Sequence, residues 1–129
     1  MMRLRIVLVF AVLLFAVAVQ AEQTVTNASA QEIYKLIHEQ GGQVTFIDVR
    51  TPEEYNDGHI KGAILMPVID SDFPEKVGEL PKDKTYVIYC RSGNRSQYAK
   101  KIMVAAGLSV IHMDGGILAW KRAGYPVVK

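Results

Sequence analysis

Cysteine is almost absent from this chain of 129 residues, because Cys90 is the only one. No disulfide can therefore form within the chain. Three histidines are scattered along the sequence, and together with one cysteine they show no zinc-ligand spacing, so we expect no metal ion and no other cofactor. A lone thiol is either buried and inert or kept for its reactivity, and its neighbours decide between the two.

A net charge of either sign is also missing beyond residue 21. Of the 15 Lys and Arg, two (Arg3 and Arg5) precede that point, which leaves 13 basic residues against 13 Asp and Glu. Nucleic acids and anionic membrane surfaces attract proteins through a basic excess. We therefore expect neither nucleic acid nor a membrane surface as the main partner. The length of 129 residues, in turn, favours one domain.

The N-terminal segment is the strongest hydrophobic feature of the chain. Arg3 and Arg5 precede 14 apolar residues at 6–19, and the small-x-small sequence Val19-Gln20-Ala21 follows. This order is typical of a secretory signal, and a membrane-spanning helix would need about 20 apolar residues. We expect a signal peptide at 1–21, a single domain at 22–129, and a periplasmic or secreted protein without membrane contact. The alternative is an uncleaved N-terminus that anchors the protein to the membrane.

Strand and helix signals alternate after the signal segment. Apolar runs rich in β-formers predict strands at 24–26, 44–49, 63–65, 85–89 and 108–113. Capping boxes at Ser29 and Thr51 begin two of the predicted helices. Another helix is expected at 96–106, with Tyr98, Ile102 and Ala105 or Ala106 facing the core. The alternation predicts an α/β domain with a mostly parallel central sheet and helices on both faces, in which sites form beyond the carboxyl ends of the strands.

Cys90 follows the clearest predicted strand and precedes a helix. The helix N-terminus favours an anion, and a turn with Gly and Asn can aim successive amides inward through unusual backbone angles. These effects, with two nearby Arg, lower the pKa of a thiol. We therefore predict that Cys90 is a nucleophile and that the residues after it bind an anionic substrate. These residues are Arg91, Ser92, Gly93, Asn94 and Arg95.

The sequence resembles the rhodanese family of thiosulfate sulfurtransferases, and most closely its small, single-domain periplasmic members. The resemblance extends over four motifs in order: Phe46–Arg50 with Pro52–Tyr55, Gly58–Ala63, Cys90–Ser96, and Asp114–Gly116 with Trp120 and Gly124–Val127. Tyrosine phosphatases place one residue more between Cys and Arg than the four found here. Arg91 is typical of members that use thiosulfate, since those that use mercaptopyruvate show Gly there.

The resemblance implies that Cys90 takes the outer sulfur of thiosulfate or a similar donor as a persulfide. Cyanide or a thiol then accepts the sulfur. A persulfide carrier or redox module that acts on a partner protein is the alternative, and a small phosphatase or arsenate-type reductase is a third.

Asp48 could form a hydrogen bond with the active loop, pair with an Arg or cap a turn. Arg50 could reach the rim of the site, although exposure of its side chain to solvent is favoured. We expect His59 to be a structural hydrogen-bonding residue, while His38 and His112 are far apart in sequence and look unrelated.

The predicted signal peptide can be tested on exported protein. N-terminal sequencing should begin near Glu22, because cleavage follows the small-x-small sequence that ends at Ala21. Recovery of Met1 in the membrane fraction would instead support the uncleaved anchor.

Overall fold

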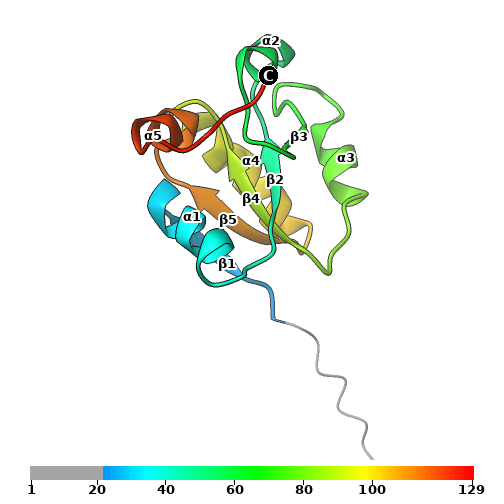
Figure 1. Ribbon diagram of the computed structural model, residues 1–129. Helices are drawn as coiled ribbons and strands as arrows, with labels where there is room; N and C mark the ends of the chain where they lie inside the picture. Colours follow the sequence, from blue (N-terminus) through cyan, green and yellow to red (C-terminus); the bar gives the residue numbers. More distant parts are fainter. Residues whose placement is uncertain (1–21) are drawn as a thin grey trace, which may run out of the picture.

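The computed structural model describes residues 22–129, so the predicted signal peptide and its cleavage point lie outside the described residues (Figure 1). Five strands form one sheet in the order β1-β5-β4-β2-β3, and every pairing is parallel. The strands are β1 (Val25–Ala28), β2 (Thr45–Asp48), β3 (Ile64–Leu65), β4 (Thr85–Tyr89) and β5 (Ser109–Met113).

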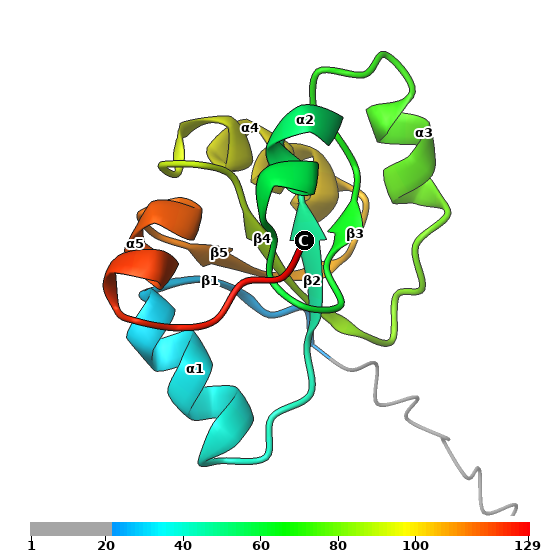
Figure 2. The same cartoon turned by 45° about the horizontal axis from the view of Figure 1, so that its top comes forward.

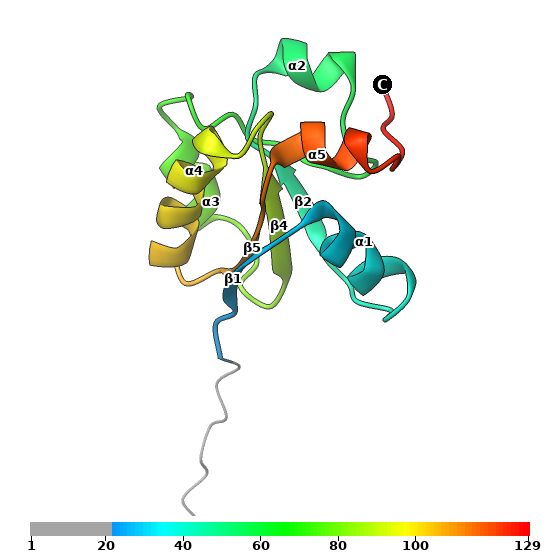
Figure 3. The same cartoon turned by 90° about the vertical axis from the view of Figure 1, so that its left-hand side faces the viewer.

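Helices cover both faces of the sheet, as Figure 3 shows from the side. They are α1 (Ala30–His38), α2 (Pro52–Asp57), α3 (Phe73–Gly78), α4 (Asn94–Ala105) and α5 (Gly116–Arg122). The helices α3 and α4 pack on one face and α1 and α5 on the other, while α2 lies beyond the sheet. The predicted single α/β domain with a parallel sheet is thus confirmed. Within residues 22–129, no helix has the length and apolar character that crossing a membrane requires.

The central strand β4 is buried on both sides. Tyr86 and Ile88 contribute to the core under α3 and α4, whereas Val87 and Tyr89 contribute to the core under α1 and α5. A strand covered on both faces needs a continuous apolar run, and the sequence of β4 is such a run. Cys90 therefore follows the most constrained part of the sheet.

Two helices begin at the capping boxes that the sequence predicts. Ser29 Oγ accepts the Glu32 amide hydrogen at 3.1 Å, and Thr51 Oγ1 accepts that of Glu54 at 3.3 Å. Each cap satisfies the backbone N–H of the third helical residue and that of the cap residue itself.

The prediction for α4 was wrong in its start and in placing Tyr98 toward the core, whereas Ile102 and Ala106 pack against the core as expected. The helix begins at Asn94 rather than at residue 96, and Tyr98 is 61% exposed. The buried residues are Ser96, Ala99 and Met103. Ser96 was not expected among the buried residues because it is polar. Its hydroxyl can be buried because it has hydrogen-bond partners.

The C-terminal segment returns from α5 toward the loop after α2 (Figure 2). His59 and Val128 exchange two backbone hydrogen bonds of 2.8 Å, and Trp120 Nε1 donates to the Pro126 carbonyl at 2.9 Å. These contacts close the side of the molecule that faces the carboxyl ends of β2 and β3.

Candidate active site

The Cys90 sulfur lies at the base of the turn between β4 and α4. Its Sγ accepts the Gly93 amide hydrogen at 3.0 Å and the Ser96 hydroxyl hydrogen at 3.3 Å. Gly93 adopts the left-handed φ of 109° that folds the turn back over the sulfur. Asn94 was expected to share this role, but no non-glycine residue among 22–129 has a positive φ, so Gly93 supplies the unusual backbone angle here.

The surroundings of Cys90 favour its ionised form although the residue is only 1% exposed. Burial raises the pKa of the thiol, but the hydroxyl of Ser96 and the amides of Ser96, Gly93 and Ser92 lower it by more, so its pKa falls below the ordinary value. The Ser96 amide lies in the first turn of α4, where helical N–H groups have no intrahelical partner, and the amides of Ser92 and Gly93 lie just before it. The predicted anion cradle is thus present in the geometry.

The N-terminus of α5 holds the loop from behind. Ile117 N–H donates to the Cys90 carbonyl at 2.9 Å, and Leu118 N–H donates to the Arg91 carbonyl at 3.2 Å. Gly116, with φ of 62°, lies so close that a Cβ atom there would be 2.4 Å from the Arg91 oxygen. The close approach of the two backbones therefore requires glycine at this position.

Asp48 and Arg50 form a buried ion pair beside the loop. Arg50 donates to both carboxylate oxygens of Asp48, the shortest contact being 2.7 Å, and to the Gly58 carbonyl at 2.7 Å. Among the roles considered for Asp48, the structure shows two: it pairs with an Arg, and its Oδ1 also caps the turn by accepting the backbone N–H of Arg50 at 3.0 Å. The favoured solvent exposure of Arg50 was wrong, because the residue is 4% exposed. Complete hydrogen bonding explains how the pair tolerates burial.

The remaining side chains of the loop differ in their exposure and in their hydrogen bonds. Arg91, Ser92 and Asn94 are exposed. Arg95 donates two hydrogen bonds to Glu54, at 2.7 and 2.9 Å, so its guanidinium is held toward α2. The pairing with Glu54 raises the pKa of Arg95, and the charge of the Cys90 thiolate adds to this effect. Sequence reasoning saw Glu54 as a helix cap and missed its second role.

His112 is the residue that sequence reasoning most clearly missed. It is 1% exposed, its Nε2 lies 2.7 Å from Ser96 Oγ, and its Nδ1 lies 2.9 Å from Asp114 Oδ1. A usable signal existed, because adjacent parallel strands at 85–89 and 108–113 place His112 beside Ile88. His59, in contrast, has its Nδ1 2.9 Å from the Tyr55 carbonyl, and its predicted structural role is confirmed.

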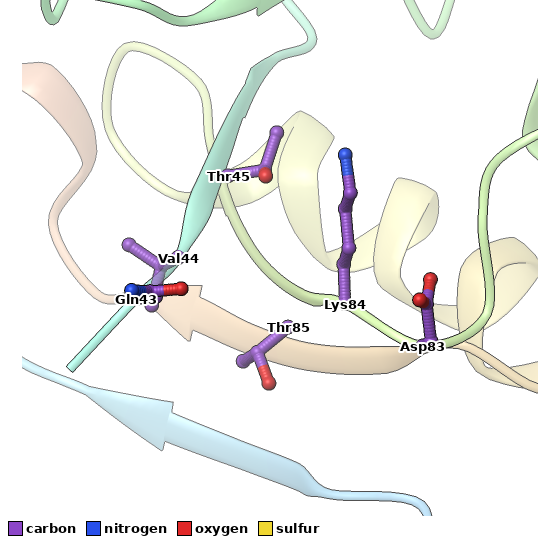
Figure 4. Close-up of a pocket in the computed structure, with 6 residues that line it drawn as sticks. All are labelled: Gln43, Val44, Thr45, Asp83, Lys84 and Thr85. Atoms are coloured by element: carbon purple, nitrogen blue, oxygen red, sulfur yellow. The ribbon is translucent and has the colours of Figure 1, made fainter.

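A hollow of about 400 Å³ lies far from this site (Figure 4). Its walls come from residues 43–45, at the start of β2, and from residues 83–85, at the start of β4. Because β2 and β4 are parallel, this hollow is at the amino ends of the strands, opposite to Cys90. It therefore takes no part in the chemistry of the thiol.

Comparisons with known proteins agree with this geometry. A family model described as the rhodanese-like domain matches residues 29–123. A sulfurtransferase of Allochromatium vinosum is 42% identical over 86 residues, which are 66% of this chain and 78% of that protein. An uncharacterized protein of Synechocystis is 39% identical over 84% of this chain, which spans 60% of its length. The crystal structure of a rhodanese-related protein from Thermoplasma volcanium superposes with a TM-score of 0.69 at 34% identity and covers 83% of this chain and 98% of that one.

Gly116→Ala should distort the Cys90 loop. The added Cβ would collide with the Arg91 carbonyl oxygen at 2.4 Å, so the loop and α5 must separate. We expect a loss of about 2 kcal/mol or more in the free energy of unfolding, measured in urea, and slower alkylation of Cys90. Gly62→Ala is the matched control, since Gly62 also has a positive φ but open space around it. Equal effects of both substitutions would contradict the close-packing argument.

Glu54→Gln should destabilise the protein in a pH-dependent manner. The hydrogen bonds from Arg95, opposed by burial and aided by Thr51, lower the pKa of Glu54 from 4.5 to about 2. The stabilisation is therefore present above the unfolded pKa and is lost as pH falls toward 2. Because both side chains are partly exposed, we expect a difference of about 1 kcal/mol between wild type and variant at pH 7.

Urea unfolding at pH 7, 4.5 and 3 measures the effect of Glu54. The difference between wild type and Glu54→Gln should shrink over this series. Glu53→Gln, at the exposed neighbour in the same helical turn, is the control and should change little. A difference that stays constant with pH would show that the charge of Glu54 is not its cause.

Proposed function

The chain belongs to the rhodanese-like domain family, and from this premise we propose that it is a thiosulfate sulfurtransferase that carries sulfur as a persulfide on Cys90. The observation that supports this most directly is the position of Sγ, which accepts hydrogen bonds from the Gly93 amide and the Ser96 hydroxyl. A thiolate held in this way is a strong nucleophile at neutral pH. The similar Allochromatium protein is named as a sulfurtransferase, which supports the same reaction class.

The first half of the reaction moves sulfur onto the protein. The Cys90 thiolate attacks the outer sulfur of thiosulfate and forms a new S–S bond. The bond between the two sulfurs of thiosulfate breaks, and its electron pair leaves with sulfite. In the persulfide that remains, the negative charge lies on the terminal sulfur, one S–S bond beyond Sγ, and we assign its stabilisation to the amides of the loop around Sγ.

The second half moves sulfur to an acceptor. Cyanide attacks the outer sulfur of the persulfide, the S–S bond of the persulfide breaks, and its electron pair returns to Cys90 Sγ. Thiocyanate leaves and the thiolate is restored, so the cycle is of the ping-pong type. A thiol is an equivalent acceptor, since it also brings a nucleophile to the terminal sulfur.

Arg91 is the side chain best placed to select an anionic donor. It is exposed at the loop that covers Cys90. Arg95, in contrast, is already bound to Glu54. We therefore assign donor binding mainly to Arg91 and to the loop amides, while Arg95 adds positive charge near the sulfur. We also propose that the protein acts in the periplasm or outside the cell, after removal of residues 1–21.

Thiocyanate formation from thiosulfate and cyanide tests the proposal. Wild type should turn over, and Cys90→Ser should be inactive, because a hydroxyl cannot carry the transferred sulfur. Arg91→Ala should raise KM for thiosulfate about tenfold and leave kcat nearly unchanged, as expected when a charged contact acts in binding.

The assay also separates the proposed enzyme from the alternative carrier. Lack of turnover by folded wild type with both substrates would refute a thiosulfate sulfurtransferase. If mass spectrometry then finds a persulfide on Cys90, a carrier that serves a partner protein replaces it. If no persulfide forms, sulfur transfer itself is refuted.

A further inference from the structure

A chain of hydrogen bonds connects the Cys90 sulfur with the protein surface. Ser96 Oγ lies 3.3 Å from Cys90 Sγ and 2.7 Å from His112 Nε2. His112 Nδ1 lies 2.9 Å from Asp114 Oδ1. Ser96 is 0% exposed, and the side chains of His112 and Asp114 are 1% and 55% exposed. The reaction steps above use Cys90 and leave His112, a buried base two contacts away, without a role.

The number of hydrogens in this chain restricts its states. Ser96 has one hydroxyl hydrogen, which it can donate either to sulfur or to His112. When the hydroxyl donates to the thiolate, its oxygen must accept from Nε2, so Nε2 carries a hydrogen. The carboxylate of Asp114 is an acceptor only, so Nδ1 carries a hydrogen as well. A histidine with both hydrogens is an imidazolium, and the thiolate state therefore includes a positive charge on His112.

The neutral state satisfies the same contacts in the other direction. The Cys90 thiol donates to Ser96 Oγ, the hydroxyl donates to Nε2, and Nδ1–H still donates to Asp114. Every polar atom of the chain keeps a partner, as buried groups require. The two states differ only in the position of two protons.

We propose that His112 is a positioning residue that receives the proton of Cys90 through the hydroxyl of Ser96, an inference that rests on the proposed use of Cys90 as a nucleophile. The S–H bond of Cys90 breaks and its proton goes to Ser96 Oγ, while the hydroxyl proton of Ser96 goes to His112 Nε2. No electrons are lost or gained. The result is a thiolate and an imidazolium, and Asp114 stabilises the latter.

The other groups around His112 are compatible with this transfer. Gln97, on α4, places its Nε2 3.4 Å from His112 Nδ1, but an amide nitrogen is a donor only, so this contact is not a hydrogen bond while Nδ1–H donates to Asp114. Asn27, on β1, is the strand partner of His112 and accepts a hydrogen bond from Lys100 at 2.8 Å. Of these neighbours, Gln97 and Asn27 do not titrate, and Lys100 is directed to Asn27. Among the hydrogen bonds of residues 22–129, the charged side chain in contact with the imidazole ring is that of Asp114.

The rate of Cys90 alkylation by iodoacetamide as a function of pH tests the relay, because it reports the thiolate directly. His112→Gln keeps a hydrogen-bond donor for Ser96 but cannot hold the proton. We expect the midpoint of the profile to rise by about one pH unit, as expected for the loss of a charge near the sulfur. Ser96→Ala should raise it at least as far, and the double variant should add nothing to Ser96→Ala. An unchanged midpoint in folded His112→Gln, or additive shifts, would overturn the proposal.

Asp114→Asn provides a second test that does not disturb a buried residue. A carboxylate near a thiol by itself opposes ionisation, so its removal would lower the alkylation midpoint. If the relay operates, the Asp114 carboxylate has the opposite effect and lowers the alkylation midpoint, because it stabilises the imidazolium that accompanies the thiolate. We expect the midpoint to rise, by less than in His112→Gln. A lower or unchanged midpoint overturns the relay, even if His112→Gln fails to fold.

Thiocyanate assays on the same samples separate this inference from the proposed function. Turnover by wild type with unchanged alkylation midpoints in the variants would refute the relay and leave the sulfurtransferase in place. Raised midpoints without turnover would refute the thiosulfate reaction and leave the relay as a property of the thiol.

Discussion

The site depends on how the negative charge of a buried sulfur is stabilised. Cys90 is 1% exposed, so water cannot solvate the thiolate, and protein donors have to replace it. The Gly93 amide and the Ser96 hydroxyl do so directly. Their positions follow from the turn that joins the central strand to α4, and the pKa of the thiol falls because these donors outweigh the cost of burial.

The rest of the carboxyl edge of the sheet keeps this turn in place. The N-terminus of α5 binds the carbonyls of Cys90 and Arg91, which directs the amides of the loop inward. On the other side, Arg95 joins α4 to Glu54 of α2, and the pair of Asp48 and Arg50 joins the end of β2 to the Gly58 carbonyl. Several short elements, none rigid by itself, thus fix one loop through contacts that each use charge or backbone polarity.

The sequence was sufficient for the parts of the fold that depend on local chemistry. The strand at 85–89, the two capping boxes and the alternation that produces a parallel sheet follow from residue types and spacing. Cys90 could be proposed as the nucleophile for the same reason, since Cys90 and its loop are contiguous.

What the sequence left unresolved depends on contacts between distant segments. The bond of Glu54 with Arg95 spans 41 residues, and that of Ser96 with His112 spans 16. Ser96 was missed on the buried face of α4 because it is polar, and its burial makes sense only with sulfur and imidazole beside it. Arg50 was expected at the surface although its partner Asp48 is only two residues away, because the burial of the pair depends on segments that pack around it, such as the Gly58 carbonyl.

The distribution of charge has a consequence for the proposed cycle. Arg50 and Arg95 are each bound to a carboxylate, so uncharged donors carry most of the stabilisation of the sulfur anion. The persulfide is also an anion, with its charge on the terminal sulfur one S–S bond beyond Sγ, so the donors of the same loop lie close to both forms of Cys90. A set of unpaired arginines would in addition retain sulfite, which leaves with its negative charge. The exposed Arg91, two arginines paired with carboxylates and a polar cradle therefore suit a site that must bind one anion, hold a second and release a third.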